Sequence, residues 1–202
     1  MTLLRLRIAD DPTLWESLGF AVSDGTCTID GVELELAGSS AGSGIVGWTL
    51  EGDWPAEMDG IATLSGAAAS ATPSTASRPA SHPNHVTSID HLVVSTPDLD
   101  RTIEALLAAG LELRRIREIG KGIRQAFFWI GAVIIEVVGP QGEPGPSRLW
   151  GLAFNTIDLD ATAAFLGDRC TQPKDAVQRG RRIASVTRDA GSSVPITFMT
   201  PH

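Results

Sequence analysis

The chain has 202 residues, long enough for one large domain or two small ones. Hydrophobic residues make up 43% and charged residues 20% of it, which is ordinary for a globular protein. A net charge of −8 argues against nucleic acid or an anionic membrane as the main partner. Arg5 and Arg7 interrupt the early apolar run, and no apolar stretch is long enough to span a membrane, so we expect a soluble, cytoplasmic protein.

Residues 1–64 are predicted to form a truncated region of βαβββ type. Apolar residues alternate with arginines over 4–8, as in a half-buried strand, and a short helix follows from Pro12. A hairpin is expected around Asp30-Gly31, a turn pair typical of two-residue loops. Residues 44–50 resemble the first strand of a further module, but no helix or hairpin is expected after them.

Four charged residues fall on the polar face of this first region. Arg5 and Arg7 lie on the first strand, and Glu33 and Glu35 lie on the hairpin. We expect these four side chains to pair with one another rather than to bind a metal. Aligning the turns Asp30-Gly31 and Gly131-Ala132 makes Glu35 the counterpart of Glu136.

Residues 65–86 are predicted to be a linker. Residues 65–83 are almost wholly Ala, Ser, Thr and Pro, a composition that cannot bury a core and favours an extended path across the surface. His82 and His85 flank its end, and we expect both to be solvated. The remaining residues, 87–202, form the third segment of the predicted organisation.

A complete βαβββ unit is predicted over residues 88–140. The apolar, β-branched run 89–95 is typical of a strand, and leucines and isoleucines at helical spacing follow from Leu99 until Gly110. Glycine-punctuated runs at 111–118, 124–130 and 133–138 then predict three more strands.

The same unit recurs after a loop at 141–147. Residues 148–168 repeat residues 88–108 with a constant offset of sixty, so that Asp158-Leu159-Asp160 matches Asp98-Leu99-Asp100. The fold class is therefore predicted as α+β, with paired βαβββ modules forming facing mixed sheets around a cleft and a shorter N-terminal module of the same kind.

The segments IDHLVVSTPDLDRTIEAL and GAVIIEVVGP resemble a module of the vicinal oxygen chelate superfamily, which includes glyoxalases, bleomycin-resistance proteins and extradiol dioxygenases. The resemblance covers residues 88–140 well and the rest more loosely. It implies that a His on the first strand and a Glu on the fourth bind a metal, and His91 and Glu136 match them. The superfamily hosts many chemistries, so the resemblance indicates an architecture rather than a reaction.

Strand alternation predicts which side chains accompany this pair. With Gly131-Ala132 as a two-residue turn, Phe127 lies opposite Glu136, and Gln125 and Trp129 share their face. On the first strand, Ile89, His91 and Val93 are expected on one face, with Leu92 and Val94 behind. Trp129 either lines a pocket or fills the space as core.

The second module offers weaker ligands at the matching positions. Gly151 stands where His91 does, and Thr197, or Ile196 after a shift of one, stands at the Glu136 position. Two protein ligands fall short of the three typical of a catalytic metal. We therefore expect no cofactor or a weakly bound divalent metal (Zn, Ni, Mn or Fe), to which the C-terminal His202 is a possible contributor.

Small or pliable residues of the second module should face the same space: Gly151, Ala153, Thr197 and Met199. Space, aromatic rings and one polar pair predict a protein that binds a small, partly apolar molecule, with His91 and Glu136 as candidate catalytic residues. The alternative is a divalent-metal-dependent lyase or dioxygenase of the glyoxalase type. A third possibility is a metal-free lyase or isomerase with His91 as base.

The sequence also allows predictions about the oligomeric state, the two cysteines and the arginine-rich runs. An unpartnered sheet face predicts a homodimer, or else an N-terminal module packed against the C-terminal pair. Cys27 and Cys170 are too isolated for a disulfide framework or a zinc site, and we expect buried or idle thiols. The arginines at 114–117 and 179–182 are interpreted as an exposed strand face and a hairpin tip rather than an anion site.

Overall fold

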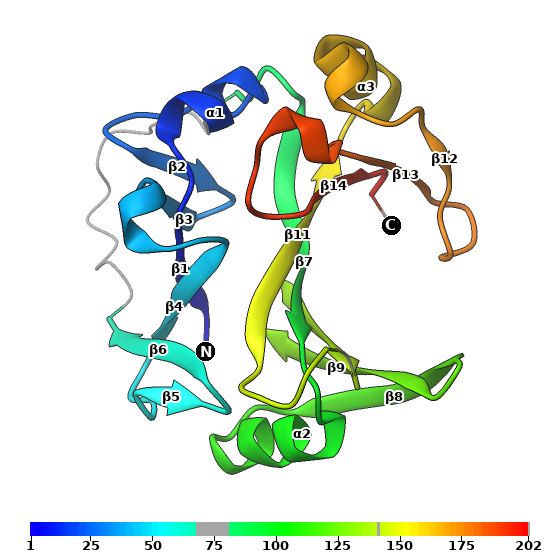
Figure 1. Ribbon diagram of the computed structural model, residues 1–202. Helices are drawn as coiled ribbons and strands as arrows, with labels where there is room; N and C mark the ends of the chain where they lie inside the picture. Colours follow the sequence, from blue (N-terminus) through cyan, green and yellow to red (C-terminus); the bar gives the residue numbers. More distant parts are fainter. Residues whose placement is uncertain (68–80, 141, 202) are drawn as a thin grey trace.

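The computed structural model describes residues 1–67, 81–140 and 142–201. Two mixed β-sheets and three α-helices make up the regular structure of these ranges (Figure 1). None of the helices within them is long and apolar enough to cross a membrane.

The larger sheet has eight strands and contains both complete modules. The first module comprises β7 (Val86–Ser95), α2 (Leu99–Ala108), β8 (Leu113–Gly120), β9 (Ile123–Ile130) and β10 (Val133–Gly139). The second comprises β11 (Arg148–Thr156), α3 (Leu159–Leu166), η2 (Gly167–Arg169), β12 (Lys174–Asp175), β13 (Arg182–Ser185), η3 (Arg188–Ala190) and β14 (Ile196–Met199). The strand order is β12-β13-β14-β11-β7-β10-β9-β8.

The first strands of the two modules, β7 and β11, pair antiparallel at the centre of this sheet. Each module's last strand then lies parallel to its first, β10 beside β7 and β14 beside β11. The sheet curves, so that β8–β9 at one end and β13 at the other flank its hollow face (Figure 1). The predicted α+β class with paired βαβββ modules is confirmed, and both modules contribute to one eight-stranded sheet.

The two modules, whose sequences repeat with an offset of sixty residues, begin their helices in the same way. Asp98 caps α2 by accepting a hydrogen bond from the Arg101 amide, and Asp158 caps α3 by accepting one from the Ala161 amide. Such caps satisfy amides that the first helical turn leaves unpaired. The hydroxyl oxygens of buried Thr102 and Thr162 also lie 2.9 and 2.8 Å from the carbonyl oxygens of the respective capping residues. The repeat therefore extends from sequence pattern to hydrogen bonding.

The smaller sheet has six strands in the order β2-β3-β1-β4-β6-β5. Its elements are β1 (Leu3–Ile8), α1 (Pro12–Ser17), β2 (Thr26–Ile29), β3 (Val32–Leu36), η1 (Ser39–Ala41), β4 (Ile45–Glu51), β5 (Glu57–Met58) and β6 (Ile61–Gly66). β1 pairs parallel with β3 and antiparallel with β4, which repeats the plan of the larger sheet. We call it the N-terminal sheet and the larger one the C-terminal sheet.

The expectation that no hairpin follows 44–50 was wrong. β5 and β6 pair antiparallel, and β6 lies parallel to β4 as the last strand of a module does. Asp59 and Gly60 form the turn with φ of 49° and 87°, the left-handed backbone that an Asp-Gly pair provides. The turn pair was present in the sequence, but β5 has only two residues, too few for an alternating pattern to be recognised.

The predicted linker overlaps regular structure at both ends, because β6 continues to Gly66 and β7 starts at Val86. Residues 68–80 lie outside the described part of the chain. The expectation of a solvated His82 was wrong, since its exposed fraction is 6%. Its Nδ1 accepts a hydrogen bond from the Ala21 amide at 3.0 Å. Buried Asn84 next to it donates to the Leu18 carbonyl, so this stretch is tied to the turn after α1.

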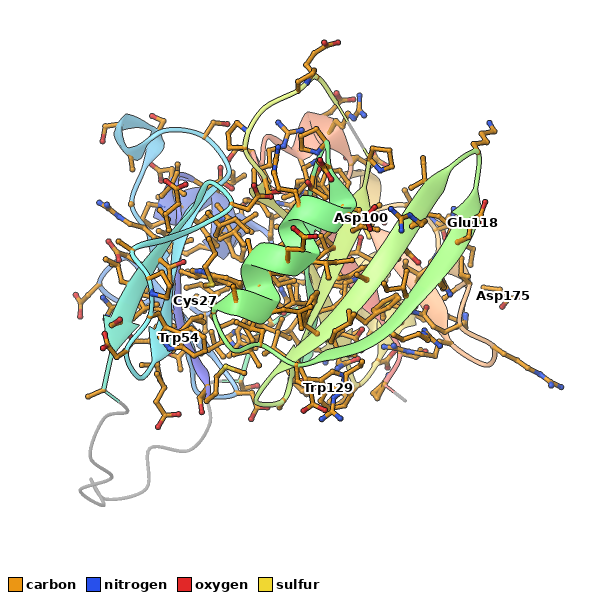
Figure 2. The ribbon with its side chains drawn as sticks, turned by 90° about the horizontal axis from the view of Figure 1, so that it is seen from below. Cys27, Trp54, Asp100, Glu118, Trp129 and Asp175 are labelled. Carbon is orange, nitrogen blue, oxygen red and sulfur yellow. The ribbon has the colours of Figure 1, made fainter. Side chains whose placement is uncertain are left out.

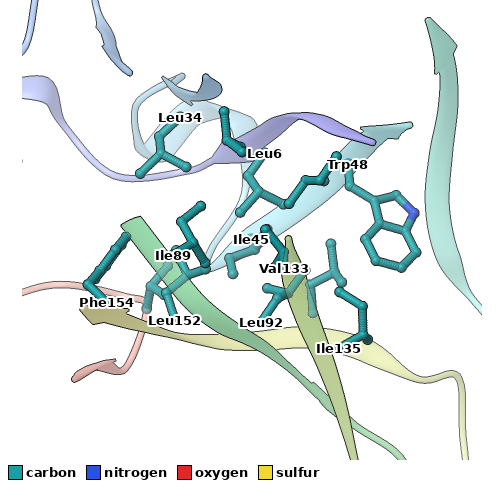
Figure 3. Close-up of a cluster of buried hydrophobic side chains, with 14 of the residues drawn as sticks. Leu6, Leu34, Ile45, Trp48, Ile89, Leu92, Val133, Ile135, Leu152 and Phe154 are labelled. Carbon is teal, nitrogen blue, oxygen red and sulfur yellow. The ribbon is translucent and has the colours of Figure 1, made fainter. Parts of the chain in front are cut away.

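The N-terminal sheet packs on the apolar face of the C-terminal sheet, and the two share a core (Figure 3). Leu6, Leu34 and Trp48 come from the N-terminal sheet and meet side chains such as Leu92 and Phe154 of the C-terminal sheet. Each fully buried side chain of this size contributes about 1.5–3 kcal/mol. The expectation that the N-terminal module packs against the C-terminal pair is confirmed, and a homodimer stays a prediction.

A buried carboxylate also joins the two sheets. Asp59, in the β5–β6 turn, accepts hydrogen bonds from Thr102, Ser147 and Arg101 at 2.5, 2.6 and 2.6 Å. Burial raises the pKa of Asp59, but these hydrogen bonds and the Arg101 charge outweigh it and hold the pKa below its ordinary range. The N-terminal sheet is thus attached beside the start of α2.

Candidate functional site

His91 and Glu136 meet on the hollow face of the C-terminal sheet. The β9–β10 hairpin has the predicted register, with Glu136 opposite Phe127 and Ile134 opposite Trp129. β10 lies parallel to β7, so that Ile134 pairs with His91. His91 Nε2 and Glu136 Oε2 are 3.6 Å apart, and both side chains are about 15% exposed, at 15% and 14%. The predicted proximity of the pair is confirmed.

A bulge in β7 changes which residues accompany His91. His91 pairs with Ala153 on β11, but Ile89 pairs with the next residue, Phe154, so Asp90 is an extra residue in β7. Ile89 therefore turns into the core between the sheets, where it is 4% exposed. The expectation that Ile89 shares the face of His91 was wrong, because strict alternation fails at a bulge.

The bulge also brings Asp90 beside the ring of its own neighbour. Asp90 Oδ2 lies 2.8 Å from His91 Nδ1, and Asp90 Oδ1 accepts a hydrogen bond from Arg181 Nη2 at 2.7 Å. Both the Asp90 and Arg181 side chains are almost fully buried, at 3% and 4% exposed. Burial raises the pKa of Asp90, but the hydrogen bonds and charges of His91 and Arg181 lower it to about 2.

Arg181 comes from the second module, immediately before β13. Its Nε donates to the Thr200 carbonyl at 2.7 Å, and its Nη2 also donates to Asn155 Oδ1 at 2.9 Å. These contacts hold the guanidinium in one orientation between the modules. The interpretation of residues 179–182 as an exposed hairpin tip was therefore wrong for Arg181, while Arg182 makes an exposed ion pair with Asp160.

Glu136 is held from the other side by Gln125. The Gln125 amide donates to Glu136 Oε1, and the Gln125 Oε1 accepts a hydrogen bond from Arg117 at 2.6 Å. Burial raises the pKa of the Glu136 carboxyl above its ordinary value, against the opposing charges of His91 and Arg117. A chain of polar contacts thus runs from Arg181 through His91 and Glu136 to Arg117.

Two adjoining cavities open on this pair. One, of about 370 Å³, lies between the modules, and the other, of about 260 Å³, lies toward β8. His91, Glu136 and Gln178 line both. The larger is otherwise mainly apolar, and the smaller is bordered by Phe127 and Trp129. Volumes of this order suit a small organic molecule.

Five further residues predicted to face the cleft do so. Gln125, Gly151, Ala153, Thr197 and Met199 line the larger cavity. Thr197 pairs with Ala153 as Glu136 pairs with Val93, and Ala153 and Val93 are sixty residues apart. Of the two alignments considered, Thr197 is therefore the counterpart of Glu136, and Ile196 is buried in the core.

Trp129 lies at the rim and is 45% exposed, so it does not serve as core (Figure 2). Phe127 is covered by arginines of β8, with the guanidinium of Arg115 4.9 Å from the ring centroid and that of Arg117 at 5.9 Å. Arg114 pairs with exposed Glu112, in keeping with the interpretation of this run as an exposed strand face.

Four residues of the site were missed from the sequence: Asp90, Arg117, Gln178 and Arg181. Asp90 adjoins His91, and that adjacency was the available signal, although adjacent strand residues normally face apart. Arg117 shares the Gln125 face of the sheet by alternation. Gln178 and Arg181 lie in the loop between β12 and β13, where no periodicity predicts orientation.

The donor set does not fit a firmly bound catalytic metal. His91 and Glu136 supply two donors, whereas such sites usually have three protein ligands. No cluster of three or more potential ligand side chains occurs in the described ranges. His202 lies outside the described residues. Thr197, which stands where a second carboxylate would, hydrogen-bonds Ser185 at 3.1 Å.

Solved structures similar to this chain cover somewhat more than half of it. Methylmalonyl-CoA epimerase from Mycobacterium tuberculosis is 25% identical over 58% of this chain and 90% of its own, with a TM-score of 0.47. The Streptomyces coelicolor epimerase is 27% identical over 57% and 94%, with a TM-score of 0.46. A hypothetical protein from Bacillus halodurans is 17% identical over 57% and 94%, with a TM-score of 0.47. No protein-family model and no curated protein matches the chain.

Proposed function

We propose that this glyoxalase-like chain binds a small, partly apolar molecule between its two C-terminal modules, with His91 and Glu136 as the polar anchor. One observation carries the proposal: both side chains line the same two cavities, and the other walls of the larger one come from both modules and are mostly apolar. A few convergent polar groups in an apolar hollow are what orient a ligand.

The pair has the chemistry for proton transfer as well as for binding. His91 Nε2 faces the cavities, Asp90 fixes the opposite ring nitrogen, and Glu136 lies 3.6 Å away. A positioned imidazole of this kind acts as a general base or acid toward a bound molecule. Metal-free isomerisation or elimination is therefore a reaction type that the site could support once a ligand is held.

A divalent-metal-dependent lyase or dioxygenase is the alternative. Its support is local: His91 Nδ1 contacts a carboxylate, as metal-binding histidines commonly do, and Glu136 is a second donor. The missing third protein donor counts against it. Zinc, nickel, manganese and iron should each bind untagged wild-type protein weakly in isothermal titration. Submicromolar binding that Glu136→Ala abolishes would overturn the metal-free proposal.

Ligand binding is tested by mapping amide chemical shifts while a set of small molecules is added, each with an apolar portion and one hydroxyl, carbonyl or carboxyl group. Shifts should cluster around His91, Glu136 and Thr197. Thr197→Phe, which fills the larger cavity, should abolish them. Thr28→Phe, on the exposed part of β2, is the matched control and should leave them unchanged.

Two outcomes would contradict the proposal. In one, no molecule of the set perturbs these amides at millimolar concentration. In the other, the shifts cluster instead in the cavity of about 480 Å³ between the two sheets, which Leu3, Ile29 and Val133 help to line and which His91 and Glu136 do not. Thr197→Phe must retain the wild-type pattern of distant amides for its loss of binding to count.

A further inference from the structure

The carboxylate of Asp90 occupies an unusual place for a strand residue. Neighbouring residues on a regular strand point to opposite faces, so a side chain does not normally reach the ring of the next residue. The bulge at Asp90 removes this restriction and sets Oδ2 2.8 Å from His91 Nδ1. Bulges are frequent beside functional sites, where they redirect a side chain.

Arg181 determines which part of Asp90 faces the histidine. Its guanidinium donates to Asp90 Oδ1, and its own orientation is set by Asn155 and the Thr200 carbonyl. A guanidinium offers donors and no acceptor, so it requires an acceptor at the Oδ1 position. The second oxygen is thereby left as an acceptor toward His91 Nδ1.

We propose that Asp90, held by Arg181, is a positioning residue that keeps the proton of neutral His91 on Nδ1 and leaves Nε2 as an acceptor toward the cavities. The inference rests on the proposed function for its consequence, because Nε2 is the ring atom that meets the ligand. The contact with Arg181 makes the second module part of the site, although that module has Gly151 and Thr197 at the ligand positions.

The class of ligand follows from the two acceptors. An unprotonated Nε2 and the Glu136 carboxylate both offer lone pairs, and their atoms are 3.6 Å apart. Glu136 Oε1 already accepts from Gln125, which leaves Oε2 for the cavity. An amine placed between Nε2 and Oε2 can donate to both acceptors, and a hydroxyl can donate to one of them, whereas an unprotonated carboxylate can donate to neither.

The test reads the tautomer directly. Proton–nitrogen correlation spectra of protein with ¹⁵N-labelled histidine, recorded at pH 8, distinguish a ring nitrogen that carries hydrogen from one that does not. His91 is assigned by comparison with His91→Gln. Wild-type protein should show a protonated Nδ1 and an unprotonated Nε2. Observation of the opposite tautomer in the wild type would overturn the proposal, and the only variant needed is the folded His91→Gln protein used for assignment.

Asp90→Asn should reverse the tautomer. Arg181 requires an acceptor, so the carboxamide oxygen turns toward it and the NH₂ group faces His91 Nδ1, which must then accept. The proton moves to Nε2. Asp100→Asn, which removes an exposed carboxylate on α2, should leave the spectrum of His91 unchanged. An Asp90→Asn protein with a native amide spectrum and the wild-type tautomer would contradict the proposal.

A hydroxyl-bearing member of the ligand set then separates this inference from the proposed function. If no small molecule binds, the proposed function fails and the tautomer result still stands. If ligands bind but His91 carries its proton on Nε2, the positioning role fails and the pocket remains. If both hold, a ligand with a hydroxyl group should bind at least about tenfold more tightly than its methyl ether, a difference equal to one net hydrogen bond.

Discussion

Glu35 and Glu136 occupy equivalent places in the two sheets and have different surroundings. Each lies on a strand that runs parallel to the first strand of its module, and Arg5 stands in the N-terminal sheet where His91 stands in the C-terminal sheet. Glu35 pairs with Arg7 at 3.2 Å and is 36% exposed. Glu136 is 14% exposed and faces a histidine. The prediction that the N-terminal charges pair with one another is confirmed.

A glutamate at this strand position is therefore not sufficient to form a candidate ligand site. On the N-terminal sheet the two neighbouring residues of β1 are Arg5 and Arg7. Glu33 and Glu35 therefore each have a permanently charged, solvent-exposed partner. On the C-terminal sheet the equivalent carboxylate is enclosed by the second module and meets an ionisable ring. Enclosure makes its charge costly, because burial removes the water that would otherwise solvate the carboxylate.

The strongest test of this difference compares two arginines. Arg181→Ala leaves buried Asp90 without its guanidinium and should lower the free energy of unfolding by about 3–5 kcal/mol. Arg7→Ala breaks an exposed pair and should cost less than about 1 kcal/mol. Urea unfolding followed by circular dichroism measures both. Equal losses for the two variants would mean that burial does not distinguish these networks.

Much of the fold could be predicted because its signals are local. Alternation, helix spacing and the offset of sixty locate the C-terminal modules, and one hairpin turn sets the direction of Glu136. The same reasoning placed Gly151, Ala153 and Thr197 at the cavity, because a repeat transfers strand register from one module to the other.

The rest depends on contacts that no local pattern contains. The bulge at Asp90 breaks the alternation on which the Ile89 prediction relied. Arg181 reaches Asp90 from ninety-one residues away, and its loop has no periodicity. His82 appeared to belong to a polar linker, yet the fold places it under the turn after α1.

The second test concerns His82, which ties the segment before β7 to the turn after α1. Glu35 and Glu136 can be compared within one protein only if the two sheets unfold as one unit. His82→Ala removes the acceptor of the Ala21 amide and should cost about 1–3 kcal/mol. Burial lowers the pKa of His82, despite an opposing hydrogen bond to the Thr28 backbone. The unfolded chain therefore takes up the proton first, and wild-type stability should fall as the pH drops below about 6.5.

Denaturant titrations between pH 5 and pH 8 measure that slope. His82→Ala should show a smaller loss of stability with acid than the wild type does. His85→Ala, which changes the partly exposed neighbour, serves as the control and should keep the wild-type slope. Separate unfolding transitions for the two sheets in wild-type protein would show that they are not one unit.

Glu136→Gln should stabilise the protein at neutral pH, by about 0.5–1.5 kcal/mol. The carboxamide oxygen can still accept from Gln125, and its NH₂ group can donate to His91 Nε2. Because burial raises the pKa of Glu136, the unfolded chain ionises first as the pH rises past about 4.5, and ionisation favours unfolding. The gain from Glu136→Gln should therefore be absent near pH 4 and grow as the pH rises. A variant less stable than wild type at pH 7 would contradict this.

The smallest effect belongs to the matched change on the N-terminal sheet. Glu35→Gln removes a carboxylate from exposed pairs with Arg5 and Arg7, at 3.8 and 3.2 Å. Arg5 keeps its contact with Glu33 at 2.6 Å, and water solvates the Arg7 guanidinium that loses its partner. The free energy of unfolding at pH 7 should change by less than about 0.5 kcal/mol, and 1 M salt should remove even that difference because the pairs are exposed. Ligand-induced shifts around His91 should be unchanged. A gain in stability as large as that of Glu136→Gln would show that the carboxylate position, rather than its enclosure, sets the cost.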